Sequence, residues 1–171
     1  MIRALPIALA ALALSSSAVA RQPPSPASLF SHLAGRWVLR GTIQNQQTTH
    51  DVDAAAVLNG GYMQLHEVSR EKDAKGAPAY EAIVYLSLDP KTSEFACLWL
   101  DTTSSAGLAP GATMGRGTAS GNSIALLFKT GADTFHTTFI YNPSADSWQW
   151  QMDGESGGKT TPFARVTLTH E

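Results

Sequence analysis

The stretch Gly35-Arg36-Trp37-Val38-Leu39-Arg40-Gly41-Thr42-Ile43 decides the fold that the sequence predicts. Its odd-numbered positions from Trp37 onward are apolar or small: Trp37, Leu39, Gly41 and Ile43. Its even-numbered positions include two arginines and a threonine. A β-strand places successive side chains on opposite faces, so this period of two indicates a strand with one dry face and one solvated face. We interpret the stretch as the opening strand of a closed antiparallel barrel.

Short turns separate the segments that follow, and no helical crossover lies between them. We expect further strands over Thr49–Leu58, Tyr62–Ser69, Tyr80–Leu88, Phe95–Asp101, Met114–Ala119, Ser123–Lys129, Thr134–Tyr141, Trp148–Met152 and Phe163–Thr169. Strands joined by short turns pair antiparallel. The predicted fold is therefore all-β: one antiparallel up-and-down β-barrel of about ten strands, preceded by a short N-terminal helix.

The turn Asn59-Gly60-Gly61 fixes which side chains of the second hairpin face inward. An even-length turn pairs residues whose numbers have an odd sum. The face of Val52, Ala54, Ala56 and Leu58 then continues as Met63, Leu65 and Glu67, so Glu67 points inward or lies at the barrel mouth, and His66 points outward. The same argument, applied to the later hairpins, places Trp150 inside with Phe139 and turns His136 outward.

The N-terminal residues read as a signal peptide rather than as part of the fold. Residues 5–14 form a short apolar run after Arg3, and Ala18-Val19-Ala20 is a small-residue cleavage pattern. We therefore predict a signal peptide over 1–20, a flexible lead-in over 21–26, one barrel domain over 27–171, and a periplasmic or secreted location. The apolar run is too short to span a membrane, so stable membrane insertion is not expected.

Composition argues against several classes of function. The chain of 171 residues has a formal net charge of −2 and no basic run, so nucleic-acid binding is not expected. Its five histidines include no pair spaced for a metal on one strand face, and no metal or cofactor is predicted. Cys97 lies in a strand pattern and is interpreted as a core thiol. Gly115-Arg116-Gly117 precedes a strand, so it indicates close packing rather than a phosphate loop.

Five residues are the candidate ligand-binding set: Trp37, Glu67, Trp99, Asp101 and Trp150. Indole rings offer contact area to a flat or apolar ligand, although bulky rings equally fill a small barrel. An inward carboxylate is costly unless it is paired or lies at a wet mouth, and a ligand could pair with it. We expect a loop over Thr102–Ala112 that could close over the barrel, and a solvated turn over Asp153–Lys159.

Several short motifs, in their order along the chain, resemble a group of secreted bacterial lipocalin-like (calycin-type) barrels filed as a domain of unknown function. They are Leu33-Ala34-Gly35-Arg36-Trp37, Val57-Leu58-Asn59-Gly60-Gly61-Tyr62, Leu65-His66-Glu67, Tyr80-Glu81-Ala82, Trp99-Leu100-Asp101-Thr102 and Gly157-Gly158-Lys159. The resemblance implies the barrel and brings no activity. The Gly-x-Trp opening is also similar to that of nitrobindin-type haem barrels, which use a histidine ligand from a late strand. In lipocalins a late basic residue packs near the opening tryptophan, and Arg165 is the candidate here.

Three functional hypotheses follow. The first is an exported barrel that binds a small apolar molecule, with no catalytic residue assigned. The second is an enzyme that uses Glu67 or Asp101 as a general base. The third is haem binding through His136 or His66. The sequence leaves the oligomeric state open.

Overall fold

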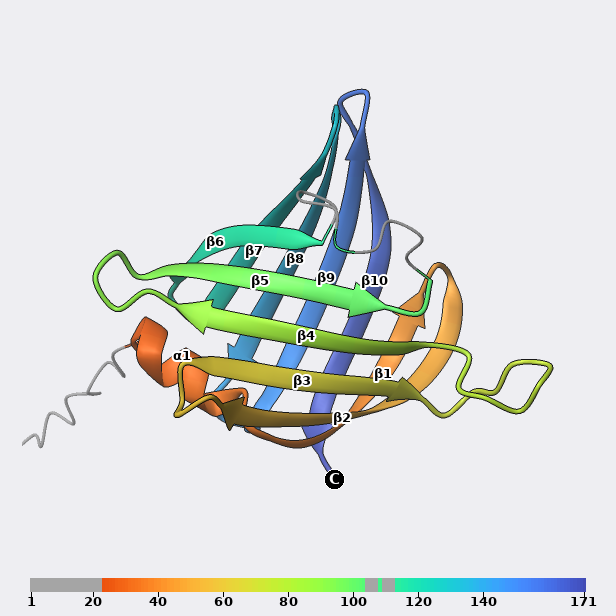
Figure 1. Cartoon of the computed structure of the whole chain (residues 1–171), viewed down its shortest axis with the longest axis horizontal. Helices are drawn as coiled ribbons and strands as arrows, with labels where there is room; N and C mark the ends of the chain where they lie inside the picture. Colours follow the sequence, from red (N-terminus) through yellow and green to blue (C-terminus); the bar gives the residue numbers. More distant parts are fainter. Residues whose placement is uncertain (1–22, 104–107, 109–112) are drawn as a thin grey trace, which may run out of the picture.

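The computed structural model shows a closed antiparallel barrel of ten strands and confirms the predicted fold class (Figure 1). The structure describes residues 23–103, 108 and 113–171. The predicted signal peptide, the start of the lead-in and most of the loop over Thr102–Ala112 lie outside these residues.

Each strand pairs with its neighbours in sequence, and β1 closes the barrel on β10. The helix is α1 (Pro26–His32), and the strands are β1 (Gly35–Ile43), β2 (Gln46–Val57), β3 (Tyr62–Ser69), β4 (Glu81–Leu88), β5 (Glu94–Asp101), β6 (Met114–Ser120), β7 (Ser123–Thr130), β8 (Asp133–Asn142), β9 (Ser147–Ser156) and β10 (Lys159–His170). Closure leaves no strand edge unpaired in the barrel wall.

The inward and outward faces follow the predicted alternation. In the β2–β3 hairpin Val52 pairs with Glu67, so the two side chains share the inner face. In the β8–β9 hairpin Phe139 pairs with Trp150, and both are fully buried. Cys97 is also buried, as expected of a core thiol, and burial raises the pKa of this thiol to about 12.

Two local predictions about turns are wrong. Leu58, expected on the inner face, is 74% exposed, because it has a φ of +50° and belongs to the turn that leads into Asn59 and Gly60. The expected solvated turn over Asp153–Lys159 is instead largely strand. There Gly157 and Gly158 both have positive φ, which allows a tight two-residue turn and lets β9 and β10 run on to it.

The glycines of β6 allow two barrel strands to approach closely. A Cβ atom on Gly117 would lie 1.7 Å from the carbonyl oxygen of Ala125, and one on Gly115 would lie 2.6 Å from the Phe128 ring. The Gly115-Arg116-Gly117 motif therefore serves close packing, as predicted.

Helix α1 closes one end of the barrel (Figure 1). Ser25 caps its first turn and Pro26 begins it. Leu29 is fully buried in the barrel core. Two indole N–H groups hold the other end of the helix: Trp37 donates to the Leu33 carbonyl at 2.9 Å, and Trp148 donates to the His32 carbonyl at 3.2 Å. These bonds satisfy carbonyl groups that a helix end leaves without intrahelical partners.

Candidate functional site

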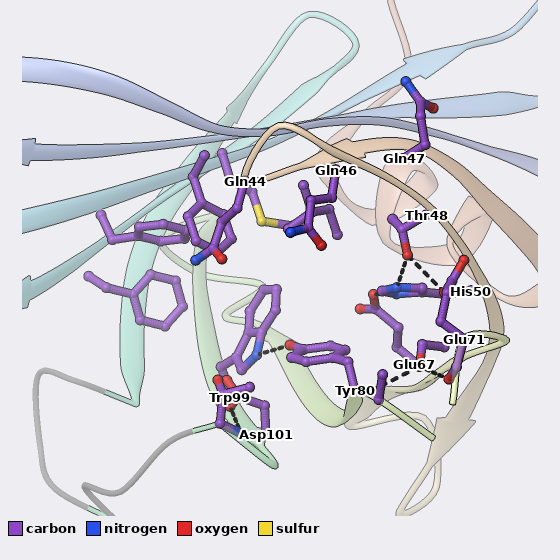
Figure 2. Close-up of a pocket in the computed structure, with 18 of the residues that line it drawn as sticks. Gln44, Gln46, Gln47, Thr48, His50, Glu67, Glu71, Tyr80, Trp99 and Asp101 are labelled. Atoms are coloured by element: carbon purple, nitrogen blue, oxygen red, sulfur yellow. Dashed lines mark hydrogen bonds and ion pairs between the residues drawn. The ribbon is translucent and has the colours of Figure 1, made fainter. Parts of the chain in front are cut away.

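A cavity of about 590 Å³ occupies the barrel at the end away from α1. It reaches the surface beside the exposed side chains of Gln44, Gln46 and Gln47, in and next to the β1–β2 turn. Most of its apolar wall consists of Ile43, Trp99, Phe128, Phe135, Met152 and Phe163. Much of its polar wall consists of Thr48, His50, Glu67, Ser69, Glu71, Tyr80 and Asp101, several of which are drawn in Figure 2. The cavity is therefore amphipathic, with an aromatic side and an acidic side.

The polar wall is built around a buried histidine–carboxylate pair. His50 comes from β2 and Glu67 from β3, and only 3% and 2% of their surfaces are exposed. Nδ1 of His50 lies in close hydrogen-bond contact with Oε1 of Glu67. The alternation of β2 places His50 on the same inward face as Val52, which is the strand partner of Glu67. The two polar residues therefore meet inside the barrel as a consequence of strand register.

Thr48 and Glu71 continue this contact toward the surface. Oγ1 of Thr48 lies 2.7 Å from Nε2 of His50 and donates its hydrogen to Oε2 of Glu71 at 3.0 Å. Glu71 also accepts the backbone N–H of Thr49 at 2.9 Å. Burial raises the pKa of the Glu71 carboxyl, but backbone N–H groups and the Thr48 hydroxyl stabilise its charge and lower the pKa overall.

The directions of these bonds locate a proton on His50. A threonine hydroxyl has one hydrogen, and that of Thr48 is given to Glu71. Nε2 of His50 must then be the donor in its contact with Thr48. The contact between Nδ1 of His50 and Oε1 of Glu67 also requires one proton between the two atoms. The pair therefore carries no net charge, whether that proton belongs to the imidazole or to the carboxyl group.

The second carboxylate oxygen of Glu67 has no hydrogen-bond partner in the part of the chain that the structure describes. Oε2 is buried and makes no hydrogen bond with any residue that the structure describes. Figure 2 shows the Glu67 carboxylate beside His50, with one oxygen toward the cavity. A buried acceptor without a donor destabilises a protein by about 1–3 kcal/mol. Oε2 is thus the group in the cavity wall that most requires a hydrogen-bond donor.

Tyr80 and Trp99 lie next to each other at the cavity, joined by a hydrogen bond (Figure 2). Nε1 of Trp99 donates to Oη of Tyr80 at 3.2 Å. The Tyr80 backbone is held directly before β4, where its N–H donates to Oγ of Ser69 at 2.9 Å. Burial, followed by the negative charges of Glu67 and Asp101, raises the pKa of the Tyr80 phenol above its ordinary value. Tyr80 therefore presents a neutral hydroxyl to the cavity.

Asp101 lies at the end of β5 and lines the same cavity. Its Oδ1 accepts hydrogen bonds from the backbone N–H and the hydroxyl of Thr103, at 2.8 Å and 2.7 Å. The side chain is half-buried, so this carboxylate belongs to the mouth of the cavity rather than to its floor.

The five residues of the predicted ligand-binding set divide into two groups. Glu67, Trp99 and Asp101 line the cavity together. Trp37 and Trp150 lie in the core outside its lining: Trp37 stacks on His170 with ring centroids 3.9 Å apart, and Trp150 donates to Oγ1 of Thr137 at 2.6 Å. Both indoles point inward, as predicted. Trp37 binds the end of α1, and Trp150 packs in the centre of the barrel, so neither contacts the cavity.

The lipocalin-like contact between Arg165 and the opening tryptophan is absent. Arg165 pairs with Thr42 in the register of β1 and β10 and donates to Asp153 at 2.5 Å on the outer surface. His170 occupies the position against Trp37 instead. Strand parity explains the difference, because Arg165 faces away from Val166, which is buried.

The two histidines suggested as haem ligands face outward. His66 contacts Glu81 at 2.7 Å and His136 contacts Glu155 at 3.2 Å, and all four side chains are about half exposed. The inward histidine is His50, and both of its ring nitrogens are engaged. These residues do not fit a haem inside the barrel. Within the described ranges, no group of three or more potential metal ligands is present.

Sequence reasoning missed most of the polar wall, including Thr48, Ser69 and Glu71, and the two residues at its centre, His50 and Tyr80. The signal for His50 was available, because it has the same parity as Val52 and Ala54 in one strand. Tyr80 precedes β4 and is positioned by Ser69, a contact between separate strands that no local pattern reveals.

No protein-family model matches the chain, and no curated protein matches it at significant similarity. Among the described residues, α1 is the one helix, and it is too short and insufficiently apolar to cross a membrane.

Proposed function

We propose that this protein is a calycin-like barrel that binds a small, mainly apolar molecule in the cavity opposite α1. The observation that carries the proposal is the buried Oε2 of Glu67, which accepts no hydrogen bond from any described residue and belongs to the wall of a cavity of about 590 Å³. A ligand with an N–H or O–H group would supply the donor that this oxygen lacks. Ligand sites in proteins are typically concave, largely apolar and equipped with a few polar groups that orient the ligand.

The apolar wall supports the same function. Trp99, Phe128 and Phe135 come from three different strands and converge on the cavity. Trp99 meets the Phe128 ring edge-on, with centroids 6.4 Å apart, and its own ring is fixed by the hydrogen bond to Tyr80. Held in this way, the indole offers contact area to a ligand at little further entropic cost.

The proposal includes export. It rests on the signal-peptide pattern of residues 1–20, and the location it implies is periplasmic or secreted. Amino-terminal sequencing of the protein recovered from a periplasmic fraction tests this part. A mature terminus at Arg21 supports export, whereas an intact Met1 contradicts it.

Binding can be measured with N-phenylnaphthylamine, a neutral probe that fluoresces in apolar surroundings. We expect saturable binding to the wild type. Met152 lines the cavity, so Met152→Trp should fill it and weaken binding by about tenfold or more. Gln151→Trp is the matched control, because the same indole is then placed one residue away on the outer face of β9. Equal binding by the two variants, or none by the wild type, contradicts the proposal.

A second candidate, favoured by the hydrogen-bonded chain from Glu67 through His50 and Thr48 to Glu71, is general-base catalysis. Glu67 would take a proton from a bound molecule, and the chain connects it to the exposed Glu71. Nitrobenzisoxazole, whose ring opens when a base removes one proton, is a suitable probe. The wild type and Glu81→Gln should accelerate ring opening equally, and Glu67→Gln should lose the acceleration. Equal rates for all three proteins exclude this role.

A further inference from the structure

The ionisable groups around the cavity are mainly acidic. Glu67, Glu71 and Asp101 contribute three carboxyl groups to its lining. His50 is the one basic side chain among the described residues that line it, and no lysine or arginine is found there. The part of the sequence over 104–112 contains no charged residue that could alter this balance.

The proton on His50 offsets only one of these charges. The hydrogen-bond directions make the His50–Glu67 pair neutral as a unit, because one proton is shared between them in addition to the one on Nε2. Glu71 and Asp101 add two further acidic groups, and each accepts two hydrogen bonds from threonine N–H or O–H groups. The wall therefore has a net negative charge at neutral pH.

Tyr80 lies in the same wall as these carboxyl groups. After burial, the charges of Glu67 and Asp101 are the largest causes that raise the pKa of its phenol. The charges of Glu67 and Asp101 disfavour a phenolate at Tyr80, and they would likewise repel an anionic ligand near the Tyr80 hydroxyl. A cationic ligand at the same place would be attracted. Fatty acids and other carboxylate ligands are thus poorly matched to this cavity.

The aromatic side chains favour the same sign of ligand charge. Trp99 and Tyr80 line the same cavity as the carboxylates, and aromatic rings attract cations through their quadrupoles. Oε2 of Glu67 accepts hydrogen bonds, and an ammonium group brings only donors.

We propose that the ligand is a protonated organic amine with an apolar body, whose N–H group donates to Oε2 of Glu67. The apolar body lies against Trp99, Phe128 and Met152. This inference rests on the proposed binding function and specifies the chemical class of the ligand.

Displacement of N-phenylnaphthylamine by three matched compounds tests the ligand class. Naphthylmethylamine, naphthylmethanol and naphthylacetate share one apolar group and carry a cationic, neutral or anionic head. We expect the amine to bind about tenfold more tightly than the alcohol, and the acid to bind most weakly. In Glu67→Gln the advantage of the amine over the alcohol should fall to about threefold or less.

Glu81→Gln is the control for that substitution. Glu81 also pairs with a histidine, but on the outer surface, so its loss should leave the ranking of the three compounds unchanged. Should Glu67→Gln fold poorly, the ranking in the wild type alone decides the matter.

The outcomes separate the two proposals. Suppose that N-phenylnaphthylamine binds, but the amine, the alcohol and the acid displace it equally well, or the acid displaces it best. The amine inference is then overturned while the binding function stands. If the probe does not bind the wild type, the binding function itself is contradicted and the amine inference is overturned with it.

Discussion

The His50 imidazole lies stacked on the Tyr80 phenol ring, with centroids 5.6 Å apart and planes inclined by 25°. This contact joins the two halves of the polar wall. On one side His50 is bound to Glu67, and on the other Tyr80 is bound to Trp99. The orientation of the cavity's polar groups therefore depends on a stack between a residue of β2 and a residue that precedes β4.

Removing the Tyr80 hydroxyl tests this arrangement. Tyr80→Phe keeps the stack but leaves the Trp99 N–H without its acceptor, so we expect a loss of about 1–2 kcal/mol in the free energy of unfolding. Urea denaturation measures the change. Tyr85→Phe is the control, since Oη of Tyr85 accepts from Gln64 on the outer face and should matter by less than about 0.5 kcal/mol. An equal loss in both variants would contradict the structural role of Tyr80.

The raised pKa of Tyr80 predicts a stability change in alkaline solution. The unfolded chain loses this phenolic proton near pH 10, whereas the folded chain retains it, because burial and the charges of Glu67 and Asp101 raise the pKa. Above about pH 10 the native state thus binds more protons than the unfolded state, and stability falls as pH rises. Phenolate absorbance should show the Tyr80 phenol ionising only when the barrel unfolds. In Tyr80→Phe that delayed ionisation should disappear, and its persistence there would assign it to another tyrosine.

A double-mutant cycle measures the coupling between His50 and Glu67. His50→Leu leaves the buried Glu67 carboxylate without its histidine partner, and we expect a loss of about 3–5 kcal/mol in the free energy of unfolding. Adding Glu67→Leu removes the unpaired group and should restore more than about 1 kcal/mol. Additive losses measured by urea denaturation would show that the two side chains act independently.

Two glycines in strands should respond in opposite ways to alanine. Gly117→Ala forces a Cβ atom against the Ala125 carbonyl, with no flexible side chain to move aside, and should destabilise the barrel by about 1–3 kcal/mol. Gly154→Ala meets nothing within 4 Å and should be neutral or stabilise by up to about 1 kcal/mol. Thermal unfolding of the two variants compares them directly. Similar behaviour would contradict the close approach of β6 and β7.

Strand parity predicted most of the barrel and part of the site. The odd pairing sum of the β2–β3 hairpin placed Glu67 inside and His66 outside, and the structure confirms both. The prediction worked because an even turn and an apolar face together fix the register. It failed at Leu58 because Val57 is the last residue of β2 that pairs with β3, so Leu58 belongs to the turn and not to the strand.

The division of the inward tryptophans between core and cavity could not be predicted in this way. Strand parity places both Trp99 and Trp150 on the inner wall, and their ring centroids lie 5.3 Å apart. Only the long-range placement of α1, bound by Trp37 and Trp148, decides which barrel end is filled. The cavity is what remains at the other end, and its volume depends on all ten strands at once.

Trp37 and Trp148 bind the carbonyls of Leu33 and His32 and so hold α1 across one end of the barrel. The barrel is therefore a cup that is open at the other end. A molecule that enters such a cup must leave through the same rim, so its dwell time is governed by the side chains around that opening. For the binding function that we propose, this geometry implies that the ligand is taken up and released through one opening.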